Sequence, residues 1–152
     1  MNITDRMKIM SDFKTGELYS DIHTEETVIQ SLLTEQAAYR TTNSNFIAAR
    51  GNECKEAQDI ELEVKLSLPA TDEAGKKLTI EQREVALARV LKIHEGYQAA
   101  LTKQREVDAH QIDLAIRIDS AIRRRESLLA VLRLRTAQIM FLAGARETLA
   151  AS

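Results

Sequence analysis

The stretch from Ile93 to Gly144 constrains the fold most, because it contains no proline and no glycine between Gly96 and Gly144. Residues spaced alternately by four and three along it are mostly apolar, a spacing that keeps one stripe of a helix facing a partner. We call this stripe the seam; it consists of Ile93, Tyr97, Ala100, Gln104, Val107, Gln111, Leu114, Ile118, Ala121, Arg125, Leu128, Leu132, Arg135, Ile139 and Leu142. The spacing predicts one long helix with a pause near Gly96 and a candidate C-cap at Gly144.

Composition favours an all-α fold for the whole chain. Of its 152 residues only five are glycine and one is proline, while 44% are hydrophobic and 29% charged, which is too apolar for a disordered protein. Residues 1–76 hold 8 basic and 14 acidic residues, a net charge of −6, and residues 77–152 hold 13 and 9, a net charge of +4. Halves of opposite charge suit a chain that pairs with itself.

A second helical pattern is expected over residues 22–68, after an N-terminal arm at 1–21. Thr24 is a candidate N-cap, Gly51 and Asn52 permit a kink, and one face carries Ile29, Leu32, Gln36, Tyr39, Asn43, Phe46 and Arg50. Residues 60–68 alternate strictly between apolar and polar, which by itself indicates a strand. We favour helix to about Ser67, because Glu and Lys are poor strand residues, and keep a short β-hairpin near 60–80 as the alternative.

The polar residues 69–78 are expected to form a turn, with Pro69 ending one helix and a capping box of Thr79 and Gln82 starting the next over 79–148. The predicted fold is therefore a long antiparallel helical hairpin, similar to a coiled coil. Equal rise on both sides pairs residues whose numbers sum to about 148, which places Glu25 near Arg123 and Ile29 near Asp119.

The long helix is expected to extend past the first one, and its extension is the most apolar part of the chain. Either residues 1–21 cover it or a second chain does, so a homo-oligomer is the expected state. The candidate interface residues are Leu128, Leu132, Ile139 and Leu142.

Arginines form the only dense basic feature, and an arginine-rich helix can bind phosphate. The candidates for nucleic-acid contact are Arg117, Arg123, Arg124 and Arg133. Acidic neighbours favour the alternative of a salt-bridged face. Arg125 lies on the seam and is expected to pair with an acid of the first helix and to matter for stability, whereas Arg124 is expected to matter little.

Catalytic, metal and cofactor sites are not expected. His23, His94 and His110 are far apart, only His110 and Asp113 have a one-turn spacing, and zinc needs more ligands than two. The single cysteine, Cys54, is expected to be a small buried residue. We therefore expect a non-enzymatic protein without cofactors that is cytoplasmic, with no membrane partner, since even residues 127–142 contain Arg133 and Arg135.

The turn sequence Gly75-Lys76-Lys77-Leu78-Thr79, followed by Glu81 and Arg83 and by a long charged helix closing on Leu142-Ala143-Gly144-Ala145, resembles small helical-hairpin proteins of bacteriophage and prophage recombination or early-gene clusters. The resemblance covers roughly residues 55–145. It implies an accessory to single-strand annealing or other DNA recombination, with no catalytic residues to carry over. Direct nucleic-acid binding and inhibition of a host enzyme or defence protein are the alternatives.

Overall fold

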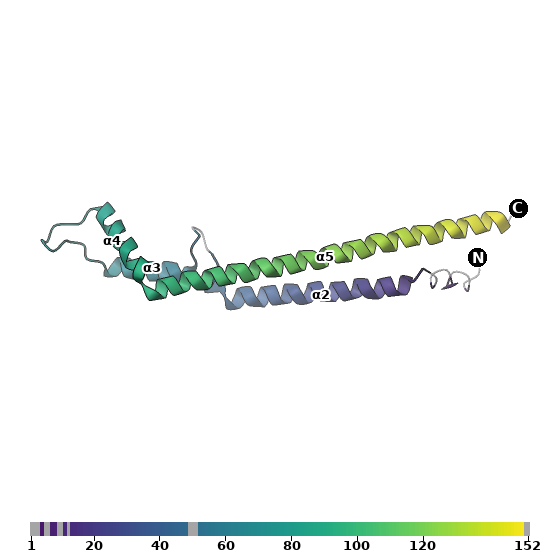
Figure 1. The fold of residues 1–152 in the computed structure, drawn as a ribbon, viewed down its shortest axis with the longest axis horizontal. Helices are drawn as coiled ribbons and strands as arrows, with labels where there is room; N and C mark the ends of the chain where they lie inside the picture. Colours follow the sequence, from purple (N-terminus) through teal and green to yellow (C-terminus); the bar gives the residue numbers. More distant parts are fainter. Residues whose placement is uncertain (1–3, 5–6, 9–10, 12, 49–51, 151–152) are drawn as a thin grey trace. The chain divides into compact units, whose positions relative to one another are not determined.

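The computed structural model describes residues 4, 7–8, 11, 13–48 and 52–150, with side chains through Gly144. Its named elements are α2 (Thr15–Thr42), the short 3-10 helix η1 (Ser44–Phe46), α3 (Lys55–Ser67), α4 (Ile80–Ile93) and α5 (Glu95–Ala150). Figure 1 labels the α-helices. The all-α prediction is confirmed. Because the described residues contain no β-strand, the alternative of a β-hairpin near 60–80 is not supported.

Helix α3 shows why the alternating segment 60–68 is not a strand. Ala57 and Val64 are buried and Ile60 is half-buried, so that residues spaced as on one helical face pack into the core. The helix ends at Ser67, whose hydroxyl donates to the Val64 carbonyl, and Pro69 follows. Burial of the helical face outweighs the alternating pattern, and Leu62 and Leu66 are left exposed.

Both expected long helices are interrupted. The first begins earlier than expected, at Thr15, so the Thr24 hydroxyl donates to the Ser20 carbonyl inside α2 instead of capping a helix. It stops at Thr42, the 3-10 helix η1 follows, and the next α-helix among the described residues begins at Lys55. The second is divided at His94, whose extended backbone separates α4 from α5.

The C-terminal helix does not stop at the expected glycine. Helix α5 passes Gly144 and continues to Ala150, so this glycine is not a C-cap. Of the predicted helical face in the first half, Arg50 lies outside the described residues.

The turn between α3 and α4 is held by local hydrogen bonds. The Gln82 amide donates to Thr79 Oγ1 at 3.2 Å and the Thr79 amide donates to Gln82 Oε1 at 2.9 Å, which confirms the capping box. The Asp72 carboxylate accepts from the amides of Ala74 and Lys76. Gly75 has a φ of +75°, which glycine adopts without steric cost.

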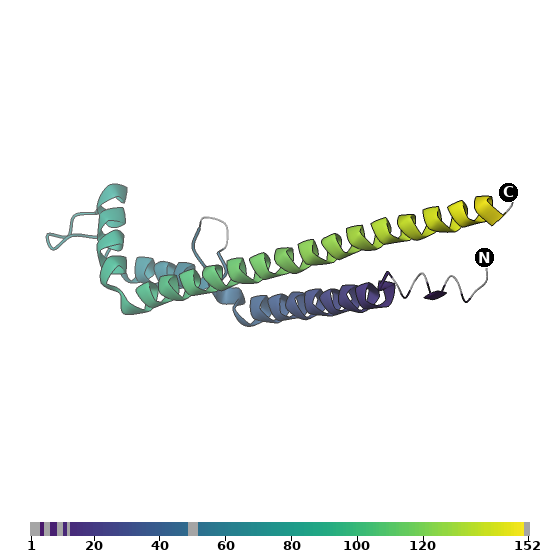
Figure 2. The same ribbon diagram turned by 45° about the vertical axis from the view of Figure 1, so that its right-hand side comes forward.

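The chain forms two compact units. The terminal unit comprises Met1–Glu35 and Leu114–Ser152, and the central unit comprises Gln36–Asp113, so α2 and α5 each contribute to both. In the central unit α3 lies beside the first turns of α5 in both views (Figures 1 and 2). The core of this unit contains Cys54, Ala57, Val64, Leu91, Tyr97 and Ala100, with Phe46, Ile60, Leu87, Val90 and Leu101 packed around it.

Candidate interaction surfaces

The seam of α5 is the most buried face of that helix. Tyr97, Ala100, Gln104, Val107, Leu114 and Ala121 are buried, and Gln111, Ile118, Arg125, Leu128, Leu132, Arg135 and Ile139 are half-buried. The two ends differ, since Ile93 belongs to α4 and is exposed, and Leu142 is also exposed. The four-three spacing thus identifies the inward face of α5 from Tyr97 to Ile139.

Ion pairs connect α5 to α2 within the terminal unit. Arg124 Nε lies 3.0 Å from Glu25 Oε1, and Arg125 Nε lies 3.0 Å from Glu26 Oε1. Arg117 Nη1 lies 3.7 Å from Glu35 Oε1. The observed partner of Glu25 is therefore one residue from the expected Arg123.

The remaining arginines make different contacts. Arg123 pairs with Asp119 on its own helix at 2.8 Å, and Arg135 donates to the Phe13 carbonyl. Arg133 is exposed, and the described residues place no carboxylate against it. Three of the four candidate phosphate-binding arginines, Arg117, Arg123 and Arg124, thus face carboxylates that would have to be displaced by a phosphate.

The expected pairing of Arg125 with an acid of the first helix is confirmed, and the carboxylates that pair with Arg124 and Arg125 differ in burial. The side chain of Glu25 is 19% exposed and that of Glu26 is 45% exposed. The Oε2 atom of Glu25 is buried, and no hydrogen-bond partner for it lies among the described residues. Arg124 therefore neutralises the more desolvated carboxylate, whereas Arg125 and Glu26 are both partly exposed, at 38% and 45%.

The apolar end of α5 presents side chains that the seam does not include. Of the candidate interface residues, Leu128, Leu132 and Ile139 are half-buried and only Leu142 is exposed. The large apolar side chains most open to solvent here are Leu134, Met140 and Phe141, at 60%, 70% and 76% exposure. These three residues belong to the apolar extension that the sequence predicts to need a cover, but the four interface candidates follow the seam and so do not include them.

Among the described residues, one helix, α5, is long and apolar enough to cross a membrane. Its most apolar stretch is not buried inside the protein. The charges it carries weigh against a span. An arginine at a helix centre costs about 2.5–3.5 kcal/mol on insertion, while a Leu, Ile, Phe or Val returns only about 0.3–0.6 kcal/mol. Arg133 and Arg135 together therefore offset the nine Leu, Ile, Val, Met and Phe residues between Leu128 and Leu142.

In the central unit, the Gln104 side chain hydrogen-bonds to the backbone of the segment that precedes α3. Its side-chain oxygen accepts from the Cys54 amide at 2.8 Å, and its side-chain nitrogen donates to the Asn52 carbonyl at 2.8 Å. This seam glutamine thus bonds to backbone groups and not to a second helix. Gln111 differs, because its Nε2 atom is buried without a hydrogen-bond partner among the described residues.

Cys54 and Tyr97 lie beside this contact. Cys54 is fully buried, as expected for a small core residue, and its thiol faces the Ala100 carbonyl. The Tyr97 hydroxyl donates to Glu53 Oε1 at 2.7 Å. Burial, reinforced by the Glu53 carboxylate, raises the pKa of Tyr97 to about 12. A neutral, hydrogen-bonded tyrosine of this kind supports the structure and is not poised to give up a proton near neutral pH.

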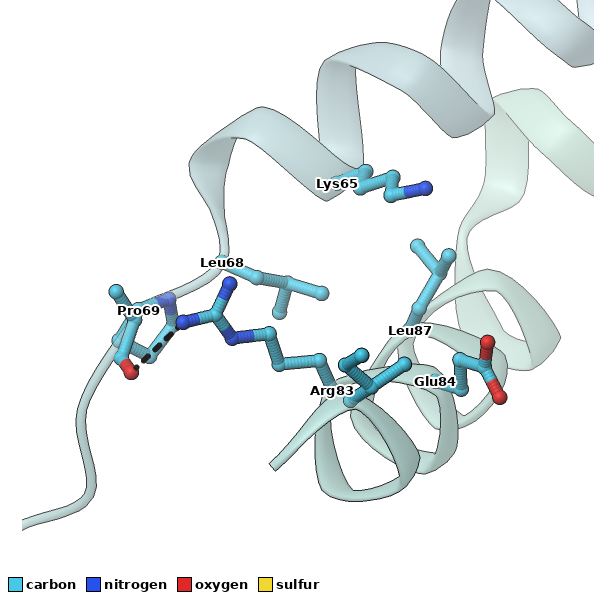
Figure 3. A pocket seen from close by; sticks show the side chains of 8 residues that line it. Lys65, Leu68, Pro69, Arg83, Glu84 and Leu87 are labelled. Atoms are coloured by element: carbon cyan, nitrogen blue, oxygen red, sulfur yellow. Dashed lines mark hydrogen bonds between the residues drawn. The ribbon is translucent and has the colours of Figure 1, made fainter. Parts of the chain in front are cut away.

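A small open cavity lies between the end of α3 and the start of α4. Figure 3 shows Leu68, Pro69 and Leu87 around it, with Lys65 and Arg83 at its edge. Arg83 donates to the Ala70 carbonyl at 3.3 Å. The volume of about 270 Å³ lies below the range of about 300–1,000 Å³ that is usual for ligand pockets, so we do not assign it a ligand.

The histidines have structural neighbours. The His110 ring packs on Tyr39 with centroids 4.2 Å apart, and His94 Nδ1 accepts from the Tyr97 amide at the start of α5. In the portion of the chain that the structure covers, no three His, Cys, Asp or Glu residues are grouped to hold a metal ion.

Comparisons with protein-family models, curated proteins and solved structures find no match to this chain.

Proposed function

We propose that the chain is a non-enzymatic helical interaction protein that self-associates through the apolar C-terminal part of α5. The observation that carries the proposal is the exposure of Leu134, Met140 and Phe141 close together on one helix. Large apolar side chains exposed within one short stretch of helix indicate an interaction site. Covering Phe141 alone would remove on the order of 150 Å² of apolar surface from water, about 3–4 kcal/mol before the costs of association.

Within each unit, α2 and α5 are proposed to run antiparallel. In the terminal unit residue numbers rise along α2 as they fall along α5, from the Glu25–Arg124 pair to the Glu35–Arg117 pair. In the central unit the Tyr39 ring of α2 packs on the His110 ring of α5, so the two helices are in contact there as well. Such pairing supports a helical-hairpin arrangement in which α2 covers the seam of α5 and leaves its opposite face for a partner.

The same exposed face would serve the two related roles, an accessory to DNA recombination and an inhibitor of a host enzyme or defence protein. Each of these roles needs a protein partner and no substrate. Direct nucleic-acid binding has less support, because the carboxylates of Glu35, Asp119 and Glu25 already pair with the arginines that would contact phosphate.

Sedimentation equilibrium over two decades of protein concentration tests self-association. We expect the apparent mass to rise above the 17.1 kDa of one chain as concentration increases. A mass of one chain at every concentration would overturn the proposal.

A further inference from the structure

A second stripe runs along α5, on the side opposite the half-buried seam residues. Its members are Ala130, Leu134, Ala137, Phe141 and Gly144, all exposed and spaced alternately by four and three. We call this set the outer stripe. Small residues recur every seven positions at 130, 137 and 144, and large ones at 134 and 141, so the stripe alternates between hollows and projections.

We propose that the outer stripe packs against the outer stripe of a second copy of the chain, with the two helices antiparallel. This inference rests on the proposed function and adds the residues and the direction of the contact. In an antiparallel pair small residues of one stripe face large residues of the other stripe. Leu134 then meets the partner's Ala137, Ala130 meets the partner's Phe141, and Ser127 meets the partner's Gly144.

Shape complementarity favours a second copy in this direction, and the chain's own Phe13 borders the stripe only at Ala137 and Phe141. Large side chains opposite small ones let two helices approach closely and fill the space between them, as in protein interiors. A parallel pair in register would place Phe141 on the partner's Phe141 and leave facing alanines too short to touch.

The size of the stripe indicates the strength of the contact. Five positions on one helix, flanked by Val131 and Met140, bury less than the roughly 800 Å² per partner of a typical stable interface. We therefore expect a reversible dimer with a dissociation constant on the order of micromolar or weaker.

Disulfide trapping tests the direction directly. We would prepare Ser127→Cys, Gly144→Cys and the double variant, keeping Cys54, which is fully buried, and using the parent as the matched control. Both positions are exposed, and a side chain added at Gly144 meets nothing within 4 Å. Under mild oxidation we expect the double variant to form a covalent dimer. In the proposed pair, the thiol at position 127 of one chain lies opposite the thiol at position 144 of the other.

The single variants should remain uncrosslinked, since positions 127 and 144 lie about 25 Å apart along a helix of 1.5 Å rise per residue. Efficient crosslinking of either single variant would indicate a parallel pair and overturn the inference. A parent that sediments as a dimer while none of the variants crosslinks would also overturn it, and would leave the proposed self-association standing.

Two other occupants give different results. If a lipid surface covers the stripe, the parent co-sediments with anionic phospholipid vesicles and Phe141→Asp does not. If residues 1–12 of the same chain cover it, the parent is a monomer and a chain lacking those residues associates. Either result overturns the inference.

Discussion

Replacing Gln104 by Leu should destabilise the central unit, although Leu suits an apolar seam. The substitution removes two hydrogen bonds of 2.8 Å and leaves the amide of the fully buried Cys54 without a partner. A buried donor left unsatisfied costs about 1–3 kcal/mol, and the lost bond to the Asn52 carbonyl adds about 1 kcal/mol. Because Leu regains part of this through apolar burial, we expect a net loss of about 2–3 kcal/mol.

The matched control is Gln111→Leu, on the same face of the same helix and in the same unit. Its Nε2 atom is buried and makes no hydrogen bond within the described residues, so its removal should stabilise the chain by about 1–2 kcal/mol. Urea unfolding followed by circular dichroism measures both variants against the parent. If Gln104→Leu is as stable as the parent, or if Gln111→Leu is the less stable of the two, Gln104 does not fasten the segment before α3.

Three further predictions concern charge. Arg124→Ala should lower the free energy of unfolding by about 1–2 kcal/mol, because it leaves the largely buried Glu25 without its cation. Arg125→Ala should lower it by at most about 1 kcal/mol. Thermal melts in which Arg125→Ala is the less stable variant would contradict this argument. The pKa of Tyr97 rises on folding from 10.0 to about 12, so its contribution, on the order of 2 kcal/mol, should be complete below pH 10 and lost as pH rises to about 12. Tyr97→Phe should lack this loss, and identical pH profiles of unfolding in variant and parent would refute the assignment. Finally, titration with single- and double-stranded DNA at about 50 mM salt should show no association; binding that weakens steeply toward about 200 mM would support the nucleic-acid alternative.

The helical class and the inward face of α5 could be predicted because both follow from local spacing. Continuous four-three periodicity identified the face from Tyr97 to Ile139, and the Thr79 capping box is a signal within four residues. The break at His94 was anticipated only as a pause, because Gly96 weakens a helix without fixing where it ends. The gap between Thr42 and Lys55 includes Asn52 of the predicted kink, which has a φ of +70°, but the Gln104 bonds to Asn52 and Cys54 that hold its end are tertiary contacts and could not be predicted.

The candidate surfaces were harder to predict, because they depend on which side of a helix remains uncovered. The seam residues Leu128 and Ile139 were natural interface candidates on hydrophobicity alone, yet both are half-buried within one chain. The relative burial of Glu25 and Glu26 likewise depends on the rotation of α2, which adjacent residues in a sequence do not reveal.

Sedimentation velocity of Phe141→Asp beside Leu66→Asp tests most directly whether the exposed apolar end of α5 is the interface. Both side chains are highly exposed, one in the terminal unit and one on α3, so neither substitution should change the helical content. We predict that Leu66→Asp dimerises with the same concentration dependence as the parent, while Phe141→Asp sediments as a single chain of about 17 kDa throughout. If Phe141→Asp dimerises as the parent does, the apolar end of α5 is not the surface through which this protein associates.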